Sequence, residues 1–234
     1  MMLTVSTPGA RLISMAKSPP SKRTTPKRPS GSAYHHGGLR EALVQAAAEM
    51  VEAQGPQGLS LREAARRCGV SQAAPYRHFA SREALRGAVA AAGFRRFTDT
   101  LSEHAQGATD PERRLKRMGR GYVAFARAHP ETLRLMFGPE CADTEDPDLE
   151  QAANAAYALL EDSVAALFRE RDLAPSDQPV VTIGVWALVH GLARLLIDLP
   201  GEPPGLAALG AGGGVEQVID RGVDGLLHSR ESRR

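Results

Sequence analysis

The chain has 234 residues and a net charge of +2, a length that allows one or two domains and a sizeable core. Its two cysteines are too few for a disulfide framework or a zinc-binding spacing, which indicates a reducing cytoplasm. The sequence has no run of eighteen apolar residues and no signal-peptide pattern at its start, so we expect neither a membrane span nor secretion.

The charge is divided unevenly along the chain. Residues 1–97 contain 15 Lys and Arg against 5 Asp and Glu, whereas residues 98–234 contain 14 against 22. A basic part joined to an acidic part predicts that only the first part meets a polyanion such as double-stranded DNA.

Residues 1–33 are rich in Pro, Ser, Thr, Lys and Arg and contain no acidic residue. This composition predicts a disordered basic arm. The arm could follow DNA phosphates or enter the minor groove. Equally, it could be a solvated tail, or translation could start at Met15.

Tyr34, His35 and His36 precede the first predicted helix, residues 39–54, whose apolar residues follow the 3.6-residue period. Paired histidines suggest a metal site, but no Cys, Asp or Glu follows at ligand spacing, so we expect no metal and no cofactor.

The stretch of residues 59–85 contains three helix starts in close succession. Ser60 stands three residues before Glu63, which is the spacing of a capping box. Gly69 then supplies the left-handed residue at which a helix commonly ends.

Two further caps follow within the same stretch. Ser71 can cap a second helix over residues 72–79, and Ser81 can cap a third helix that begins at Arg82. Two short helices around a Gly-containing turn predict a helix-turn-helix, whose second helix enters the major groove of DNA. An ordinary pair of surface helices is the alternative.

The second helix has small side chains at its front and longer aromatic or basic ones behind. Gln72 can pair with adenine and Ala73 can touch a thymine methyl group, whereas the longer side chains can reach phosphates. Pro75 falls in the first turn, where a missing N–H costs little. The predicted DNA-binding residues are Ser60, Ser71, Gln72, Ala73, Ala74, Tyr76, Arg77, His78 and Arg82.

At these residues the chain resembles the TetR/AcrR family of bacterial transcription regulators. The resemblance is carried by Ser60, Gly69-Val70-Ser71, Tyr76-Arg77-His78-Phe79 and Ser81-Arg82-Glu83-Ala84-Leu85. The front of the second helix, Ala73-Ala74-Pro75, departs from the Lys, Gly, Thr or Ser usual in that family, so the operator sequence does not follow from the resemblance.

The rest of the chain shows helical periodicity without the alternation of strands, which predicts an all-α fold. We expect an N-terminal three-helix helix-turn-helix domain, joined by a long connector helix to a helical ligand-binding and dimerisation domain. The predicted domains are residues 1–33 (arm), 34–97 (DNA-binding) and 98–234 (effector-binding and dimerisation). The predicted helices beyond residue 81 are 82–106, 110–128, 131–137, 146–172, 176–199 and 215–227. Asp110 and Asp146, each followed by Pro, are the predicted caps of two of them, and residues 138–146 are expected to form a loop.

A second resemblance lies near the C-terminus. Trp186, His190 and Gly191 match the Trp-x-x-x-His-Gly signature of the WHG-type C-terminal domain found in some TetR regulators. The resemblance implies a helical domain that dimerises and takes small ligands. The alternative for His190 is a buried, hydrogen-bonded core histidine, and Trp186 is a core residue by default.

Large residues on the inward stripes of consecutive helices form a candidate effector pocket. Several are aromatic or flexible, which suits an adaptable pocket for a small, mainly apolar effector, although plain core packing would use the same residues. The predicted pocket residues are Met118, Tyr122, Phe125, Met136, Phe137, Tyr157, Trp186 and His190.

The last two long helices carry more apolar surface than one protomer can cover. We expect them to form a four-helix homodimer interface, and a two-fold dimer would place two helix-turn-helix motifs on a palindromic operator. The predicted interface residues are Leu188, Leu192, Leu195, Leu199, Val223 and Leu226.

Three functions compete for this chain. The preferred one is a cytoplasmic, ligand-responsive repressor that is released from its operator by the effector. An enzyme is the second, but the sequence has no nucleophile elbow, paired-carboxylate motif or phosphate loop, and the spacing of Ser163, His190 and Asp198 gives no triad. The third is a structural DNA-binding module, which a tightly filled core would favour and an apolar cavity within residues 111–199 would oppose.

Overall fold

The computed structural model describes residues 36–142, 145–201, 203–207 and 213–231. Within these ranges every regular element is a helix, which confirms the predicted all-α fold class. The predicted arm, residues 1–33, and the lead-in residues Tyr34 and His35 lie outside the described residues.

The N-terminal helices begin where the predicted caps stand. The Ser60 hydroxyl accepts a hydrogen bond from the backbone N–H of Glu63 at 3.4 Å, and the Ser81 hydroxyl accepts one from Ala84 at 3.2 Å. Each cap satisfies a backbone donor that a helix start leaves without a partner. The elements of this part are α1 (His36–Gln54), η1 (Pro56–Gly58), α2 (Leu61–Arg67), η2 (Ala74–Arg77) and α3 (Arg82–Ala105).

The turn after α2 has the predicted geometry at its glycine. Gly69 has a φ of +68°, in the left-handed region that glycine adopts without strain, so α2 ends there. Val70, which follows, is only partly buried.

The second helix of the predicted helix-turn-helix is shorter than the expected residues 72–79. It is the 3₁₀ helix η2, and it follows Ala73 with no side-chain cap, so the predicted capping role of Ser71 is wrong. Pro75 explains the contraction, because its ring has no N–H to make the α-helical bond to the Ser71 carbonyl. That carbonyl instead accepts a hydrogen bond from Ala74 at 3.0 Å.

Two aspartates start long helices in the second half of the chain, as predicted. The Asp110 carboxylate accepts a hydrogen bond from the N–H of Arg113 at 2.6 Å, and Asp146 accepts one from Asp148 at 3.0 Å. The elements of this half are α4 (Pro111–Ala128), α5 (Pro130–Met136), α6 (Pro139–Ala142), α7 (Pro147–Glu170), η3 (Pro175–Asp177), α8 (Gln178–Asp198), α9 (Pro204–Ala207) and α10 (Gly214–Glu231). The stretch 138–146, expected as a loop, therefore contains the short helix α6.

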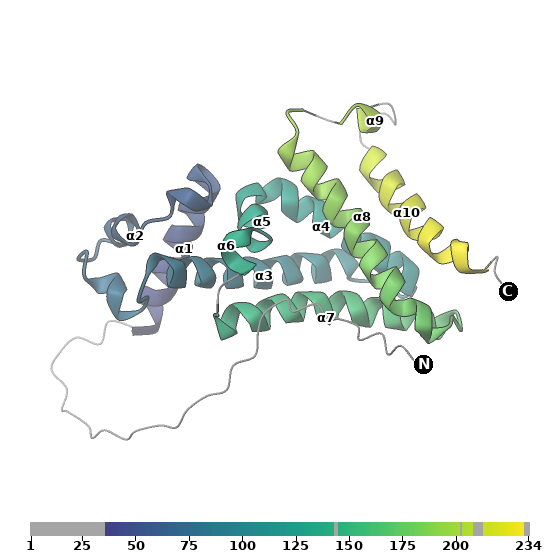
Figure 1. The fold of residues 1–234 in the computed structure, drawn as a ribbon, viewed down its shortest axis with the longest axis horizontal. Helices are drawn as coiled ribbons and strands as arrows, with labels where there is room; N and C mark the ends of the chain where they lie inside the picture. The colour runs from purple at the N-terminus through teal and green to yellow at the C-terminus, as the bar shows by residue number, and fades with distance from the viewer. Residues whose placement is uncertain (1–35, 143–144, 202, 208–212, 232–234) are drawn as a thin grey trace, which may run out of the picture.

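Helix α3 is the central element of the fold. Figure 1 shows it running from the α1–α2 end of the molecule through the middle, with α7 alongside and α8 crossing in front at an angle. Its buried residues join those of α1, α4, α5 and α7 in one continuous core, while a second core lies between α4, α7, α8 and α10. The predicted boundary between residues 97 and 98 falls inside α3, the helix expected to connect the two parts.

Helices α8 and α10 lie side by side (Figure 1) and approach closely at a glycine of α10. A Cβ atom on Gly222 would lie 2.4 Å from a terminal methyl carbon of Leu188, so only glycine fits against this leucine without a shift. On another side of α10, Arg120 of α4 donates to both carboxylate oxygens of Asp220 at 2.8 Å. These contacts fix α10 against α4 and α8.

Candidate DNA interface and ligand cavity

The recognition segment, residues 71–79, presents most of the side chains that were predicted to meet DNA. Tyr76 is 53% exposed, a large aromatic ring that the fold leaves open to solvent. The Ser60 hydroxyl is already engaged as the α2 cap. Of the predicted residues, Ser71, Gln72, Ala73, Tyr76, Arg77 and Arg82 are exposed, while Ser60, Ala74 and His78 are partly buried.

Two buried side chains hold the recognition segment to the helices behind it. Pro75 and Phe79 are buried, and the Arg40 guanidinium of α1 lies 5.4 Å from the centroid of the Phe79 ring. Sequence reasoning missed this role of Arg40, because the contact joins residues that are far apart in the chain and have no fixed spacing.

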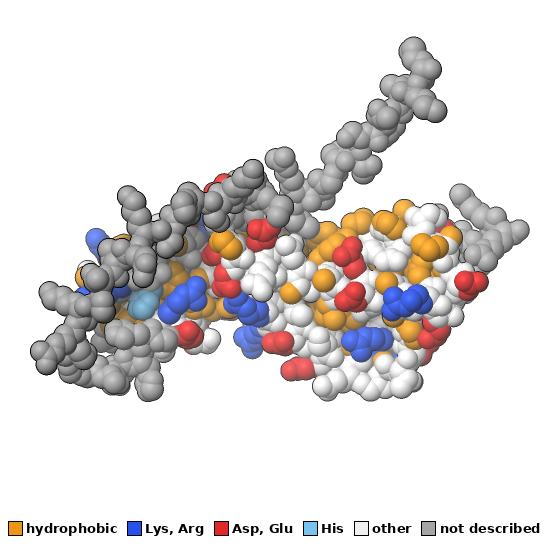
Figure 2. All heavy atoms as spheres, turned by 90° about the horizontal axis from the view of Figure 1, so that it is seen from below, with side chains coloured by type: hydrophobic (Ala, Val, Ile, Leu, Met, Phe, Trp, Pro, Cys, Tyr) orange, Lys and Arg blue, Asp and Glu red, His pale blue; other side chains and the backbone are white. Residues whose placement is uncertain are grey.

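The charges of α2 are arranged in a local network. Hydrogen bonds from Arg66 at 2.7 Å and from Arg67 at 3.1 Å hold the pKa of the Glu63 carboxyl down to about 2. Part of the positive charge of α2 is thus neutralised within the helix, whereas Arg77 of the recognition segment stands exposed. Figure 2 shows Lys and Arg side chains (blue) beside a His side chain (pale blue) at this end of the molecule.

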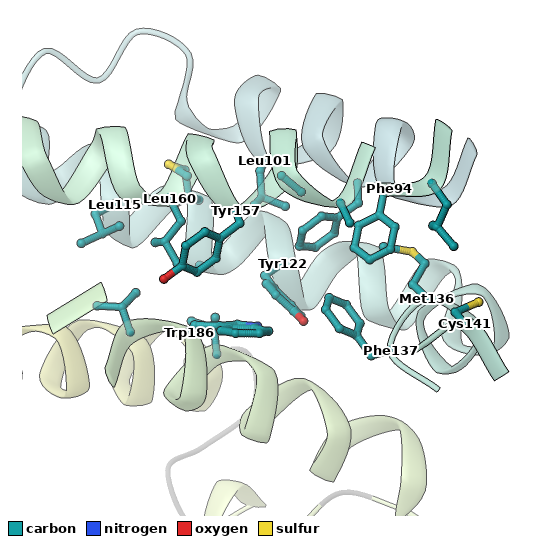
Figure 3. Close-up of a pocket in the computed structure, with 18 of the residues that line it drawn as sticks. Phe94, Leu101, Leu115, Tyr122, Met136, Phe137, Cys141, Tyr157, Leu160 and Trp186 are labelled. Atoms are coloured by element: carbon teal, nitrogen blue, oxygen red, sulfur yellow. The ribbon is translucent and has the colours of Figure 1, made fainter. Parts of the chain in front are cut away.

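A cavity of about 210 Å³ lies among α3, α4, α7 and α8 and reaches α5 and the residues that follow it (Figure 3). No charged side chain is found among the described residues that line it. Tyr157 of α7 and Trp186 of α8 are both partly buried, and their ring centroids are 5.9 Å apart. A partly open apolar space with few polar atoms is a usual form of a small-molecule site.

The structure places six of the eight predicted pocket residues around this cavity: Met118, Tyr122, Met136, Phe137, Tyr157 and Trp186. Phe125 does not line it, because this side chain is 1% exposed and packs edge-on against Phe97 in the core. His190 lies behind Tyr122 instead of in the wall.

Sequence reasoning missed the wall that α3 contributes. Phe94, Phe97 and Leu101 line the cavity, and all three belong to the apolar pattern of the predicted connector helix. That pattern has two apolar faces, and periodicity alone does not say which of them meets a cavity.

Tyr122 and His190 form a hydrogen-bonded pair of polar side chains beside the cavity. The Tyr122 hydroxyl lies 2.7 Å from Nδ1 of His190, and Figure 3 shows the hydroxyl directed toward Phe137 and Trp186. Burial raises the pKa of Tyr122 well above its usual value and lowers the pKa of His190, so both side chains are neutral at pH 7. His190 therefore pairs with Tyr122 and is not part of a triad with Ser163, whose hydroxyl donates to the Leu159 carbonyl at 2.7 Å.

A carboxylate of α1 caps the short helix α5. Glu52 accepts hydrogen bonds from the N–H of Thr132 at 2.9 Å and of Glu131 at 3.4 Å, where the positive end of the helix dipole also favours it. Helix α5 carries Met136, which lines the cavity. The helices behind the recognition segment are thus connected to the cavity wall through α5 as well as through α3.

Helix α8 has one buried and one exposed apolar face. The segment Pro175–Asp198 is long and apolar enough to cross a membrane by length and composition, and one of its faces packs against α4, α7 and α10. The exposed α8 face, defined by Val180, Ile183, Leu195 and Leu199, leaves each of these side chains 45–54% exposed. Figure 2 shows hydrophobic side chains gathered on this half of the molecule.

This arrangement corrects part of the predicted dimer interface. Leu192 and Val223 are only 6% and 1% exposed and belong to the core of their own protomer, so they cannot face a partner in this conformation. Leu188 and Leu226 are partly buried, whereas Leu195 and Leu199 are exposed. The two apolar faces of α8 look alike in the sequence. Only the packing of α4 and α7 against this helix decides which face is buried.

Comparisons with known proteins cover both halves of the chain. Residues 43–89 match the bacterial regulatory proteins of the tetR family, and residues 115–223 match the tetracyclin repressor-like C-terminal domain. The nucleoid occlusion factor SlmA of Vibrio vulnificus (strain YJ016) is 31% identical over 139 residues, which are 57% of this chain and 68% of that protein. SlmA of Photobacterium profundum is 29% identical over 163 residues, 65% of this chain and 80% of the relative.

Solved structures share the same arrangement of helices. The structure of a protein with unknown function from Rhodococcus sp. RHA1 is 32% identical and has a TM-score of 0.70, covering 86% of this chain and 99% of the other. A transcriptional regulator from the same organism, 21% identical with a TM-score of 0.62, covers 81% of this chain and 96% of the other and shares the fold.

A helix-turn-helix at one end of an all-helical chain, with an apolar cavity behind it, defines the class of DNA-binding transcriptional regulators. Within that class, the chain belongs to the TetR family, which confirms the resemblance seen in the sequence. Members of this family regulate transcription, bind DNA and act as dimers.

Proposed function

We propose that this protein is a ligand-responsive repressor that binds a palindromic operator as a homodimer and is released by a small, mainly apolar effector. The observation that carries the proposal is the preformed apolar cavity walled by α3, the same helix that begins directly after the recognition segment. In this account residues 34–97 bind DNA, residues 98–234 bind the effector and dimerise, and the protein acts in the cytoplasm.

Different residues of the recognition segment contact the bases and the phosphates of the operator. Gln72 and Ala73 are exposed and read sequence in the major groove: the Gln72 amide pairs with a base edge, and the small Ala73 lets the backbone approach. Tyr76, Arg77 and Arg82 reach phosphates and position the protein without reading sequence.

The dimer forms through the exposed α8 face and the adjoining side of α10. Ala187 and Gly191, both exposed and small, lie on α8 between Ile183 and Leu195 and allow a partner helix to approach closely. Several large apolar side chains on this face are about half exposed, which favours burial against another protein surface. In a two-fold dimer, the same face of a second protomer provides that surface.

The effector changes the distance between the two recognition segments of the dimer. A ligand in the cavity touches α4 through Tyr122 and α5 through Met136, and these helices contact α3 and α1. Major-groove binding needs the two segments about 34–36 Å apart, so spreading them by a few ångströms releases the operator. For each tenfold loss of DNA affinity, the effector must bind the released form more tightly by about 1.4 kcal/mol.

A structural DNA-binding protein without an effector is the second candidate. It is favoured by the relatives named nucleoid occlusion factors, at up to 31% identity. The cavity opposes it, because a protein that needs no ligand has no use for an apolar space of about 210 Å³. A catalytic role receives no support from the described side chains, since His190 is engaged by Tyr122 and Asp198 by Arg134.

A reporter gene placed behind DNA fragments selected by the protein tests the proposal. Transcription should be low with the protein and high without it, and a library of small neutral compounds should contain some that restore it. Ala153→Phe, which fills the cavity, should abolish that restoration, whereas Ala158→Phe on the exposed side of α7 should not. A reporter indifferent to the protein would contradict the repressor function; repression that no compound relieves would favour the effector-free alternative.

A further inference from the structure

We propose that the cavity selects a neutral aromatic molecule of about two rings with one hydroxyl group, and that the Tyr122–His190 pair recognises this hydroxyl. This specificity rests on the proposed function, in which the cavity is the effector site. Size, wall chemistry, charge and hydrogen-bonding capacity each limit the ligand in a different way.

The volume sets the size of the ligand. An apolar cavity of about 150 Å³ inside a protein holds a molecule such as benzene. The cavity here measures about 210 Å³ and is partly open, so it leaves room for a second fused ring.

The walls favour an aromatic ligand. Aromatic side chains reach the cavity from several elements, including Phe97 of α3, Tyr122 of α4 and Trp186 of α8. They already meet one another edge-on: the rings of Phe97 and Tyr122 are 4.7 Å apart at 84°. A flat ring can add further edge-to-face contacts of this kind, which stabilise binding beyond the area buried.

The charges around the pair oppose an anionic ligand. The described lining holds no Lys or Arg, and His190 is neutral because burial lowers its pKa. The cation near His190 is Arg194, one turn further along α8, and its Nε is paired with Asp198 at 2.8 Å. A carboxylate in this space would lose its hydration without gaining a partner.

The hydrogen-bonding capacity of Tyr122 specifies a hydroxyl. A phenol has one donor and two acceptor positions; the bond to His190 uses one of these three and a hydrogen bond from the Trp186 indole N–H uses another, which leaves one for a ligand. If Tyr122 donates to Nδ1, its oxygen can accept a hydrogen bond from a ligand; if Nδ1 donates, the phenol hydrogen can bond to the ligand. A hydroxyl group serves both cases, because it donates and accepts.

Three naphthalene compounds differ only in the group under test: naphthalene, 2-naphthol and 2-naphthoate. Calorimetry at neutral pH measures their affinity, and the indole N–H resonance of Trp186, the single tryptophan of the chain, reports whether each compound enters the cavity. We expect 2-naphthol to bind at least tenfold more tightly than either of the others. The nitrogen resonances of His190 should shift with 2-naphthol and stay in place with naphthalene.

Two conservative variants assign the preference to one hydroxyl. Tyr122→Phe should reduce the affinity for 2-naphthol to that for naphthalene and leave naphthalene binding unchanged. Tyr157→Phe removes a phenol hydroxyl elsewhere in the lining and should leave the tenfold preference intact. If Tyr122→Phe failed to fold, the preference among the three compounds in the unchanged protein would still decide.

The possible failures are distinguishable. Equal affinity for naphthalene and 2-naphthol, or tightest binding of 2-naphthoate, would overturn the hydroxyl specificity while the cavity remained a ligand site. If none of the three compounds moved the Trp186 resonance, the cavity would not be a ligand site, and both the specificity and the proposed effector response would fall.

Discussion

Arg134 on α5 donates a hydrogen bond from Nε to the Asp198 carboxylate at 2.9 Å, which ties α5 to the last turn of α8. The same guanidinium donates to Glu131 and to the Ile197 carbonyl. Since Glu52 of α1 caps the other end of α5, this short helix is joined both to the helix proposed to form the dimer and to the helices behind the recognition segment.

The cap on α5 should contribute measurably to stability. We expect Glu52→Ala to lower the free energy of unfolding by about 0.5–2 kcal/mol, because two backbone N–H groups lose their acceptor. Urea denaturation measures the change. Glu49→Ala is the control, since Glu49 lies on the same helix and its carboxylate accepts a hydrogen bond from the nearby Gln45 side chain at the surface; equal losses in the two variants would contradict the capping role.

The exposed α8 face should control assembly. Ile183→Glu combined with Leu195→Glu should yield monomers, because both side chains are half exposed in the protomer and would place charges inside the interface. Their folding should be unaffected for the same reason. Sedimentation velocity compares this variant with Ala158→Glu and Ala124→Glu, which add two charges at exposed positions elsewhere; a double variant that stays dimeric would refute the proposed interface.

The glycines of α10 should respond in opposite directions. Gly225→Ala should raise the free energy of unfolding by about 0.5–1 kcal/mol, because nothing lies within 4 Å of the new Cβ and alanine favours helix. Gly222→Ala should lower it by about 1–3 kcal/mol, because the new Cβ collides with Leu188 and forces a rearrangement. Thermal unfolding of both variants checks this, and a gain at Gly222 would show that α8 and α10 pack less closely.

The recognition segment should separate base reading from phosphate contact. Gln72→Ala should cost about 1–3 kcal/mol at one base position and relax the preference there. Arg77→Ala should weaken binding to all sequences alike and reduce the salt dependence by about one unit per half-site. Arg113→Ala, an exposed arginine on α4, is the control and should change neither quantity; uniform weakening by Gln72→Ala would remove the assigned base contact.

Local chemistry predicted the helix starts well. Ser60, Ser81, Asp110 and Asp146 all cap helices as expected, because a cap depends on residues two or three positions away. Pro75 was not predicted as well. The sequence placed it in the first turn of an α-helix, where proline is tolerated, but residues 74–77 form a 3₁₀ helix instead.

The faces of the helices were harder to predict than the helices themselves. Leu192 and Leu195 lie three residues apart on one apolar helix, yet the first is buried in the protomer and the second is exposed. Phe97 of α3 and Phe125 of α4 are both core residues, but only Phe97 also borders the cavity. Such differences come from the crossing of helices distant in sequence, which no periodicity encodes.

Selection of DNA from a random pool by the purified protein tests whether a dimer binds a palindromic operator. We expect enrichment of an inverted repeat with half-sites about one helical turn apart, bound by one dimer. We also expect Gln72→Ala to alter the preferred sequence of both half-sites at the same symmetric position. Enrichment of a single half-site bound by a monomer, or no enrichment over the starting pool, would contradict the account.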